Sequence, residues 1–447
     1  MHPSRRSFLQ QLTAGAVIAP WVTRGLLAQS PNSVIRHASF GAAGMAKSDY
    51  TAIAKHPAVK VVAACDVDLN RTAEFRKAFP EATVYQDFRE LLEKEKDLQT
   101  VNVSTPDHMH GPIGMAALQR GLHVYGQKPL THDLYECRRL AEVARERKLV
   151  TQMGIQIHSS PEYRTAVKLV QDGVIGKIKE VHTWSSKAWG DVGEKPERTD
   201  AAPEGLDWDR WLGGCAERPF IGQGWYHPGN WRKRLDFGTG TFGDMGCHIY
   251  DPVFKALALT APLSVRSEGA APNDHSWATD AICHYLFPGT AFTAEKTVRV
   301  TWYDGKQRPP ADILALAVNA DGDANDKENK APGQGSIFIG TNGVMVLPHV
   351  GAPRLVGPEV QGRKIETVDG TNHWHQFIDA ARGEGKTSAN FDYAGPLTEA
   401  VLLGSVASRF PQQELQWDAA ALKFTNFAEA NALVKRAYRK GWDIAGL

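Results

Sequence analysis

Asp244 and His248 are the pair of residues in this chain whose types and spacing best suit chemistry. They stand four positions apart in a predicted helix, so both side chains are expected on one helix face. A carboxylate and an imidazole presented together can orient a hydroxyl group and accept its proton. Lys128, which precedes Pro129, would stabilise the developing alkoxide. These three candidate catalytic residues predict proton transfer at a carbinol or carbonyl carbon; the alternative for His248 is a core histidine bonded to the backbone.

A turn after the first predicted strand occupies the place of a dinucleotide-binding fingerprint. Gly41 takes the first glycine position, whereas Ala43 and Ala46 take the third and sixth. A strand is expected before this turn and a helix after it, and Asp66 ends the next strand. An acidic group there binds ribose hydroxyls and repels a 2′-phosphate, which favours NAD, although the nearby Arg71 would suit NADP. The alternative is a tight turn in an α/β domain that binds no nucleotide.

The elements that must position these residues divide the chain into two folded parts. Strands and helices alternate over residues 33–154, which predicts a Rossmann domain with a doubly wound parallel sheet. Over residues 155–447, strand-like runs such as 178–184 and 281–287 appear without alternating helices. This second pattern predicts a C-terminal α+β domain with a large open, mainly antiparallel sheet. Further strands are expected within 291–301 and 335–347, helices at 372–382, 396–409 and 427–439, and a polar loop at 321–335.

The N-terminus has the pattern of an export signal. Arg5 and Arg6 precede a short uncharged stretch that is too short to span a membrane, and small residues follow near Ala28. The adjacent arginines resemble a twin-arginine signal, which is an address and not an anchor. We therefore expect a signal peptide at residues 1–28 and a periplasmic protein; the alternative is a disordered cationic terminus.

Composition narrows the kinds of partner. The net charge is +1 and 23% of residues are charged, so neither nucleic acid nor an anionic membrane surface is expected. The five cysteines are scattered without a CxxC pair, which argues against a disulfide framework or a zinc site. His108/His110 and His373/His375 form His-x-His pairs, but no carboxylate-rich cluster accompanies them, so no metal is predicted.

Three further motifs resemble those of one family. They are the segments 104–110 (STPDHMH), 124–130 (VYGQKPL) and 243–248 (GDMGCH), and their order and spacing resemble the Gfo/Idh/MocA family. The resemblance implies a Rossmann domain, a C-terminal sheet that often forms a homo-oligomer interface, and NAD(P)-dependent redox chemistry on sugars and polyols. Lys128, Asp244 and His248 match the family's catalytic positions. Gln127 departs from the family's Glu-Lys-Pro motif, so the surroundings of Lys128 are expected to differ.

Two sets of binding residues follow. The expected cofactor contacts are Gly41, Ala43, Gly44, Met45, Asp66, Arg71, Thr105, Pro106, His110 and Lys128. The stretch from Trp184 to Trp231 holds six of the twelve tryptophans, whose rings could stack on a sugar or form a small separate core. The expected substrate contacts are Gln156, Trp189, Trp225, Tyr226, Trp231 and Arg232.

Three functions compete at this level. The first is an NAD(P)-dependent oxidoreductase acting on a sugar, polyol or glycoside, with the NAD tightly bound because free NAD is scarce in the periplasm. The second is a glycoside hydrolase that transiently oxidises C3 on a retained NAD and then eliminates the glycosidic group. The third is a non-catalytic sugar-binding member, which would be expected to lack Lys128 or His248, and both are present.

Overall fold

The computed structural model describes residues 34–318 and 330–447. The predicted signal peptide at residues 1–28 and most of the predicted polar loop at 321–335 lie outside these residues. Among the helices that are described, none combines the length and the apolar character needed to cross a bilayer.

The N-terminal part is built on a six-stranded parallel sheet with the order β3-β2-β1-β4-β5-β6. Its strands are β1 (Ile35–Phe40), β2 (Val59–Cys65), β3 (Thr83–Tyr85), β4 (Thr100–Val103), β5 (His123–Gly126) and β6 (Thr151–Met153). Its helices are α2 (Met45–Ala54), α3 (Ala73–Ala78), α4 (Phe88–Lys94), α5 (His110–Gln119) and α6 (Leu134–Glu146). The near-continuous apolar run of β2 is buried along its last five residues, as expected for a strand covered on both faces. The predicted Rossmann fold is confirmed.

The C-terminal part contains a nine-stranded sheet with the order β13-β12-β11-β7-β10-β9-β8-β14-β15. Its strands are β7 (Ile178–Trp184), β8 (Ser264–Glu268), β9 (Ile282–Pro288), β10 (Thr297–Tyr303), β11 (Gly335–Gly340), β12 (Val344–Pro348), β13 (Arg354–Val356), β14 (Glu414–Asp418) and β15 (Lys423–Phe424). Among these described strands, only the β7–β10 pair is parallel. The predicted large, mainly antiparallel sheet is therefore confirmed.

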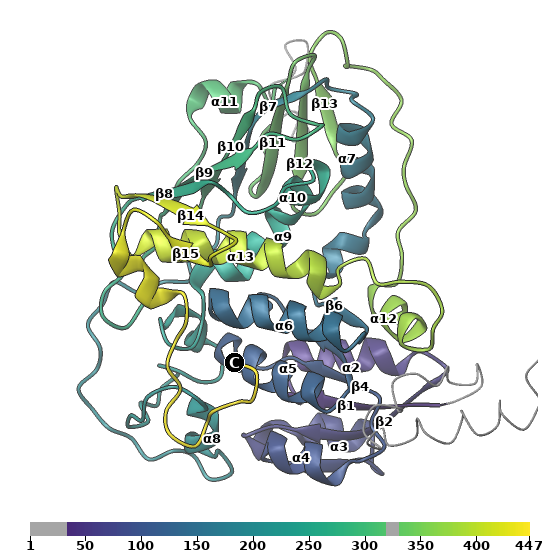
Figure 1. The fold of residues 1–447 in the computed structure, drawn as a ribbon, viewed down its shortest axis with the longest axis vertical. Coiled ribbons are helices and arrows are strands. Elements are labelled where there is room, and N and C mark those ends of the chain that lie inside the picture. Colours follow the sequence, from purple (N-terminus) through teal and green to yellow (C-terminus); the bar gives the residue numbers. More distant parts are fainter. Residues whose placement is uncertain (1–33, 319–329) are drawn as a thin grey trace, which may run out of the picture.

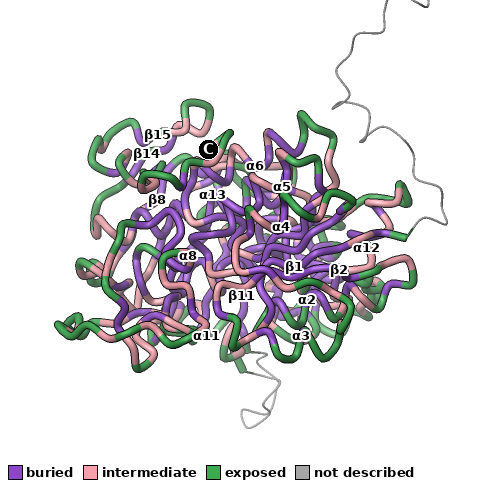
Figure 2. Tube along the Cα trace, turned by 90° about the horizontal axis from the view of Figure 1, so that it is seen from below, coloured by how far each residue is buried: buried purple, intermediate pink, exposed green. Residues whose placement is uncertain are grey.

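The long helix α13 (Phe391–Ser408) joins the two parts. It lies between α6 and the C-terminal sheet (Figure 1), and it is buried along almost its whole length. Its apolar side chains belong to one hydrophobic core that extends from the parallel sheet to β8, β9 and β10. Figure 2 shows this buried chain through the middle of the molecule, with exposed segments at its periphery. The shared hydrophobic core thereby packs the two parts against each other. Any site that lies between them depends on this packing.

Several predicted boundaries were wrong for local reasons. The helix expected from residue 396 begins at Phe391, because the Asn390 side chain accepts a hydrogen bond from the Tyr393 amide and caps it. The strand expected over 335–347 is a hairpin of two strands, β11 and β12. The helix expected over 427–439 is only the short 3₁₀ helix η7 (Ala428–Leu433).

The C-terminal tail, residues 434–447, explains why that last helix is short. It leaves the C-terminal part and crosses back to the Rossmann part, ending near α5 (Figure 1). Arg436 forms an ion pair of 2.6 Å with the buried Glu136 of α6, and the Tyr438 hydroxyl donates a hydrogen bond to the same carboxylate. The Arg436 and Tyr438 side chains both contact the Glu136 carboxylate, which is far away in the sequence. A continued helix could not direct both side chains to that one group, so these tertiary contacts are incompatible with it.

Candidate active site

A cavity of about 470 Å³ lies at the carboxyl ends of β1, β2, β4 and β5, where ligands bind in open parallel sheets. All ten predicted cofactor contacts line it: Gly41, Ala43, Gly44, Met45, Asp66, Arg71, Thr105, Pro106, His110 and Lys128. The predicted residues Gln156, Trp189, Trp231, Arg232, Asp244 and His248 line it as well. One cavity therefore contains both the fingerprint and the candidate catalytic residues.

Glycine is required at the start of the fingerprint turn. Gly41 has φ of +100°, and a Cβ atom there would lie 2.6 Å from the backbone oxygen of Ser104. Gly44, with φ of +59°, stands at the N-cap of α2. The turn therefore brings backbone amides and the positive end of α2 to the cavity, where a diphosphate would be stabilised.

Asp66 is held at the end of β2 by two backbone amides. Its carboxylate accepts hydrogen bonds from the amides of Ala42 at 2.9 Å and Asp68 at 3.0 Å. This arrangement orients Asp66 beside the fingerprint turn, at the position where an acidic residue meets ribose hydroxyls in this fold.

Lys128 and Asp244 form a largely buried ion pair at the junction of the two parts. Nζ of Lys128 lies 2.7 Å from Oδ1 of Asp244 and 2.8 Å from its backbone oxygen, and both side chains are less than 15% exposed. Trp189 Nε1 donates to Oδ2 at 2.7 Å, and Arg232 lies 3.3 Å from Oδ1. Burial alone would raise the pKa of Asp244, but the charges of Lys128 and Arg232 outweigh it and hold that pKa well below its usual range. The carboxylate is thus ionised and positions both cations.

His248 follows a turn of π-helix rather than a uniform α-helix. The π-helix spans Phe242–Gly246 and leads into α9 (Cys247–Ile249), a feature often found at functional sites. Gly243 permits this turn, because a Cβ there would overlap the Thr239 hydroxyl at 1.7 Å. Burial and the charge of Lys128 lower the pKa of His248 well below its usual value. The imidazole is therefore neutral at pH 7 and able to accept a proton.

Gln127 replaces a charged side chain of the family motif, and its partner is a carboxylate that sequence reasoning missed. Gln127 Nε2 donates to Oδ2 of the buried Asp49 at 2.8 Å. Asp49 also accepts from Ser104 Oγ at 2.7 Å and from Trp374 Nε1 at 2.9 Å. Burial raises the pKa of Asp49 to about 6. The carboxylate next to the lysine-bearing loop thus comes from α2, and no sequence signal links it to position 127.

Two of the predicted substrate contacts lie outside the cavity. Tyr226 is buried in a small aromatic core with Trp211 and Phe237. Trp225 packs against the Arg234 guanidinium, 3.3 Å from the ring centre, and lies outside the cavity lining. The structure therefore places Trp225 and Tyr226 in a local aromatic core beside the cavity and not in its lining, and their contact with substrate stays a prediction.

His110 and the loop around Trp231 are held by specific contacts. The two ring nitrogens of His110 lie 2.7 Å from the Pro129 oxygen and 2.8 Å from the Thr105 oxygen, so the ring joins two cavity loops. His227 pairs with Asp68 of the Rossmann part at 2.8 Å, which fastens the loop carrying Trp231 over the cavity. No group of three potential metal ligands was found within residues 34–318 and 330–447.

Sequence reasoning also missed the residues that cover the far end of the cavity. Trp442 of the C-terminal tail lines it together with Arg210 and Trp211 of α8 (Trp208–Leu212) and Asp87 of the Rossmann part. Trp442 is 6% exposed, and its ring lies under the Arg89 guanidinium at 4.5 Å. Trp442 and α8 are distant in sequence from the fingerprint, so no local periodic pattern links them to the cavity.

A fold with a parallel nucleotide-binding sheet, a second open sheet and a polar site between them defines a two-part dinucleotide-binding protein. A family model described as an oxidoreductase family with an NAD-binding Rossmann fold matches residues 35–155, and the model of its C-terminal alpha/beta domain matches residues 161–290. Together they span more than half of the chain. The chain belongs to the Gfo/Idh/MocA family of oxidoreductases.

Curated relatives match over part of their length. Levoglucosan dehydrogenase of Pseudarthrobacter phenanthrenivorans is 28% identical over 122 residues, which are 27% of this chain and 30% of the relative. A dTDP-3,4-didehydro-2,6-dideoxy-alpha-D-glucose 3-reductase of Streptomyces antibioticus is 32% identical over 171 residues, 37% of this chain and 52% of the relative. The chain thus spans about half or less of the length of these two relatives.

Solved structures share the fold at low identity. The WlbA dehydrogenase of Bordetella pertussis, solved with NADH and UDP-GlcNAcA, aligns with a TM-score of 0.60 at 14% identity, covering 86% of this chain and 99% of that one. A Thermotoga maritima protein named "putative oxidoreductase" aligns with a TM-score of 0.58 at 17% identity, covering 86% of this chain and 100% of that one. At such identities these similarities support the fold alone.

Proposed function

We propose that this protein is an NAD-dependent oxidoreductase that acts on a hydroxyl group of a sugar, polyol or glycoside. The observation that carries the proposal is the convergence of Lys128, Asp244 and His248 on the cavity that contains the dinucleotide fingerprint. Bound nicotinamide would supply the hydride acceptor. His248 would accept the hydroxyl proton, because its lowered pKa leaves the ring unprotonated at pH 7. Lys128, oriented by Asp244, would donate a hydrogen bond to the oxygen as it gains negative charge.

The surroundings of Asp66 support NAD over NADP. Its carboxylate is fixed at the cavity edge by two backbone amides and would repel a 2′-phosphate. Arg71 also lines the cavity and is the residue that would accommodate NADP instead. Titration of the nucleotide-free protein with NADH and NADPH tests this choice; tighter binding of NADPH would contradict it.

We infer that the nucleotide is tightly bound. Trp442, Arg210 and Trp211 cover one end of the cavity, and the tail that carries Trp442 is tied to α6 through Arg436. Release of a nucleotide would then require movement of the tail or of α8. The test is to purify the protein without added nucleotide, denature it and identify the released small molecules. Release of NAD in near-stoichiometric amount is expected, and a complete absence of nicotinamide nucleotide would contradict tight binding.

A second candidate is a glycoside hydrolase that oxidises and later reduces its substrate on one retained NAD. The placement of Trp442 and α8 on the cavity favours this candidate, because a nucleotide held there need not exchange during such a cycle. The deciding experiment incubates the protein with aryl glycosides and free sugars and follows both nicotinamide absorbance and aglycone release. Net NADH or a stable keto-sugar supports the dehydrogenase. Aglycone release with exchange of the C2 hydrogen for solvent deuterium, and without net NADH, supports the hydrolase.

Export and assembly complete the proposal. The paired arginines Arg5 and Arg6 support twin-arginine export to the periplasm, which fractionation of cells with and without that export pathway would test. We also propose a homo-oligomer formed through the C-terminal sheet. On β9, Ile282, His284 and Leu286 alternate with fully buried residues and are only half-buried, so one sheet face is left partly uncovered. Light scattering of the purified protein gives its mass in solution, and a monomer would contradict this assembly.

A further inference from the structure

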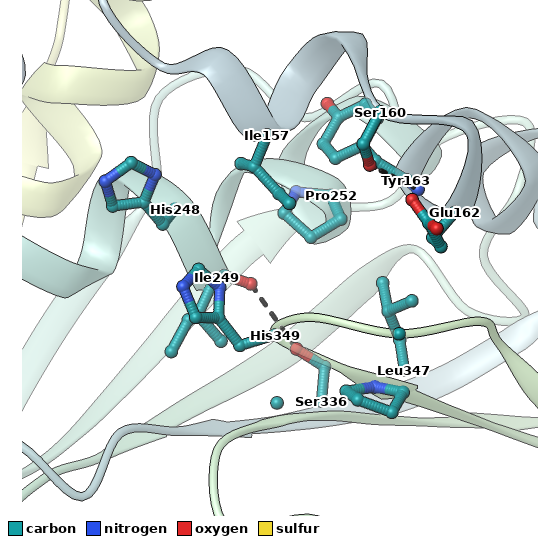
Figure 3. A pocket seen from close by; sticks show the side chains of 13 residues that line it. Ile157, Ser160, Glu162, Tyr163, His248, Ile249, Pro252, Ser336, Leu347 and His349 are labelled. Carbon is teal, nitrogen blue, oxygen red and sulfur yellow. Dashed lines mark hydrogen bonds between the residues drawn. The ribbon is translucent and has the colours of Figure 1, made fainter. Parts of the chain in front are cut away.

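A second, much smaller pocket lies beside the main cavity, and His248 lines both. Figure 3 shows it between the start of α7 (Pro161–Gln171), the segment around Pro252 and the end of β12. Its volume of about 10 Å³ is close to that needed for one water molecule. The pocket is therefore too small for a sugar. What it can hold follows from the polar atoms that face it.

His349 is the notable polar residue of this small pocket, and sequence reasoning missed it. It follows β12 directly, and its ring centre lies 5.7 Å from that of His248, with the rings tilted by 53° (Figure 3). Nδ1 of His248 and Nδ1 of His349 are both buried, and neither has a hydrogen-bond partner among the residues that the structure describes. A buried polar atom without a partner is costly, so native proteins seldom leave two side by side.

One water molecule in the small pocket would satisfy both nitrogens. The distance between the ring centres is too long for a direct bond but suits a bridge in which the water accepts from one ring and donates to the other. Ser336 also lines the pocket; its hydroxyl already bonds to Thr183 Oγ1 at 2.9 Å and lies 3.4 Å from the Ile249 oxygen. Among the described residues that line the small pocket, His248 and His349 are thus the two with a buried ring nitrogen that lacks a hydrogen-bond partner.

We propose that His349 is a positioning residue for His248, acting through one bridging water that fixes the His248 tautomer and carries its proton away. The inference rests on the proposed function. With the proton of neutral His248 held on Nδ1 by the water, Nε2 is free to accept the substrate hydroxyl proton. The Nδ1 proton then passes to the water, the water passes a proton to Nδ1 of His349, and His349 releases its Nε2 proton to solvent. One proton enters the chain and one leaves, so both rings end neutral, but each in its other tautomer. Once product has left the cavity, His349 takes a proton from solvent on Nε2, its Nδ1 proton returns through the water to Nδ1 of His248, and His248 releases its Nε2 proton to solvent, which restores the starting state.

Lys128 and Asp244 act on the pKa values of both rings in the same sense. Lys128 and Arg232 disfavour a lasting positive charge on His248, whereas Asp244 opposes them. Burial and Lys128 likewise lower the pKa of His349, and Asp244 again opposes the shift. Glu162 lines the small pocket on the side away from His248 (Figure 3). A proton on either ring would thus be short-lived, as a relay requires.

The test is nitrogen NMR of the full-length, nucleotide-loaded protein labelled with ¹⁵N-histidine, with the His248 signals assigned by their loss in His248→Gln. In the unmodified protein at pH 7, His248 is expected as the Nδ1–H tautomer. His349→Phe is expected to convert His248 to a mixture of tautomers. His349→Gln, whose amide oxygen can still accept from the water, is expected to retain the Nδ1–H tautomer. His375→Phe is the matched control, since Nε2 of His375 is also buried without a hydrogen-bond partner among the described residues and His375 lines neither pocket.

Turnover gives a second readout that a purely structural role would not change. On any sugar that the unmodified protein oxidises, His349→Gln is expected to lower kcat about tenfold with little change in KM, because the amide can hold the water but cannot pass its proton on. A His248 tautomer that is unchanged in a folded His349→Phe variant would overturn the proposal. If the tautomer shifts as expected but no sugar or glycoside is turned over by any variant, the proposed function fails while the positioning role stands.

Discussion

Replacement of Lys128 by methionine tests the central ion pair. Methionine retains most of the side-chain volume but removes the charge that lies 2.7 Å from Asp244. Removing one partner of a buried ion pair usually costs about 3–5 kcal/mol of folding free energy. Arg232 at 3.3 Å and Trp189 at 2.7 Å would still hold the carboxylate, so a cost at or below the lower limit of this range, about 2–3 kcal/mol, is expected.

The assay is a double-mutant cycle with Asp244→Asn, measured by urea unfolding at pH 7. A coupling free energy of about 2 kcal/mol is expected, because the two groups contact each other directly in a mostly buried site. Catalysis should suffer as well, with kcat/KM for Lys128→Met lowered about 10²–10³-fold. A coupling free energy below about 0.5 kcal/mol, typical of an exposed pair, would refute the view that Asp244 orients Lys128.

Three further changes have expected outcomes. Gln127→Glu places a carboxylate against Asp49. The free energy of unfolding of this variant should be about 1–3 kcal/mol lower at pH 8, where both groups tend to ionise, than at pH 5, where a proton is shared. Equal values in chemical denaturation would contradict the contact. Burial, assisted by Arg436, lowers the pKa of His108 to about 3. The contribution of His108 to the free energy of unfolding is therefore complete above pH 6.5 and falls by about 1.4 kcal/mol per pH unit below that value. His108→Gln should reduce the slope of stability against pH between about 4 and 6 by this amount, and an unchanged slope would exclude the effect. Trp442→Ala should release bound NADH about tenfold faster in a fluorescence competition assay, whereas an unchanged release rate would show that the tail does not retain the nucleotide.

Local sequence patterns were sufficient to predict the parallel sheet. They also predicted the cofactor wall, which is the part of the cavity lined by the predicted cofactor contacts. The alternation of buried strands and helices over residues 33–154 follows from periodicity that neighbouring residues carry, and it placed Gly41 and Asp66 at the correct edge of the sheet. The motif spacing also placed Lys128, Asp244 and His248 on one cavity, because a family pattern records contacts that the fold brings together. In the same way, the strands over 178–184 and 281–287 were recognisable by their own residues.

Contacts between distant segments were decided only by the tertiary structure. Nothing near position 127 indicates that its partner is Asp49, and nothing near His248 indicates that His349 lies beside it. The tail that carries Trp442 has helix-forming residues, yet its ion pair with Glu136 outweighs that propensity. Helices and strands are encoded by side chains a few positions apart, whereas these pairings depend on how whole elements pack. That is why the sequence by itself determined the fold class and the cofactor wall, and the packing of the two parts decided how the site is completed.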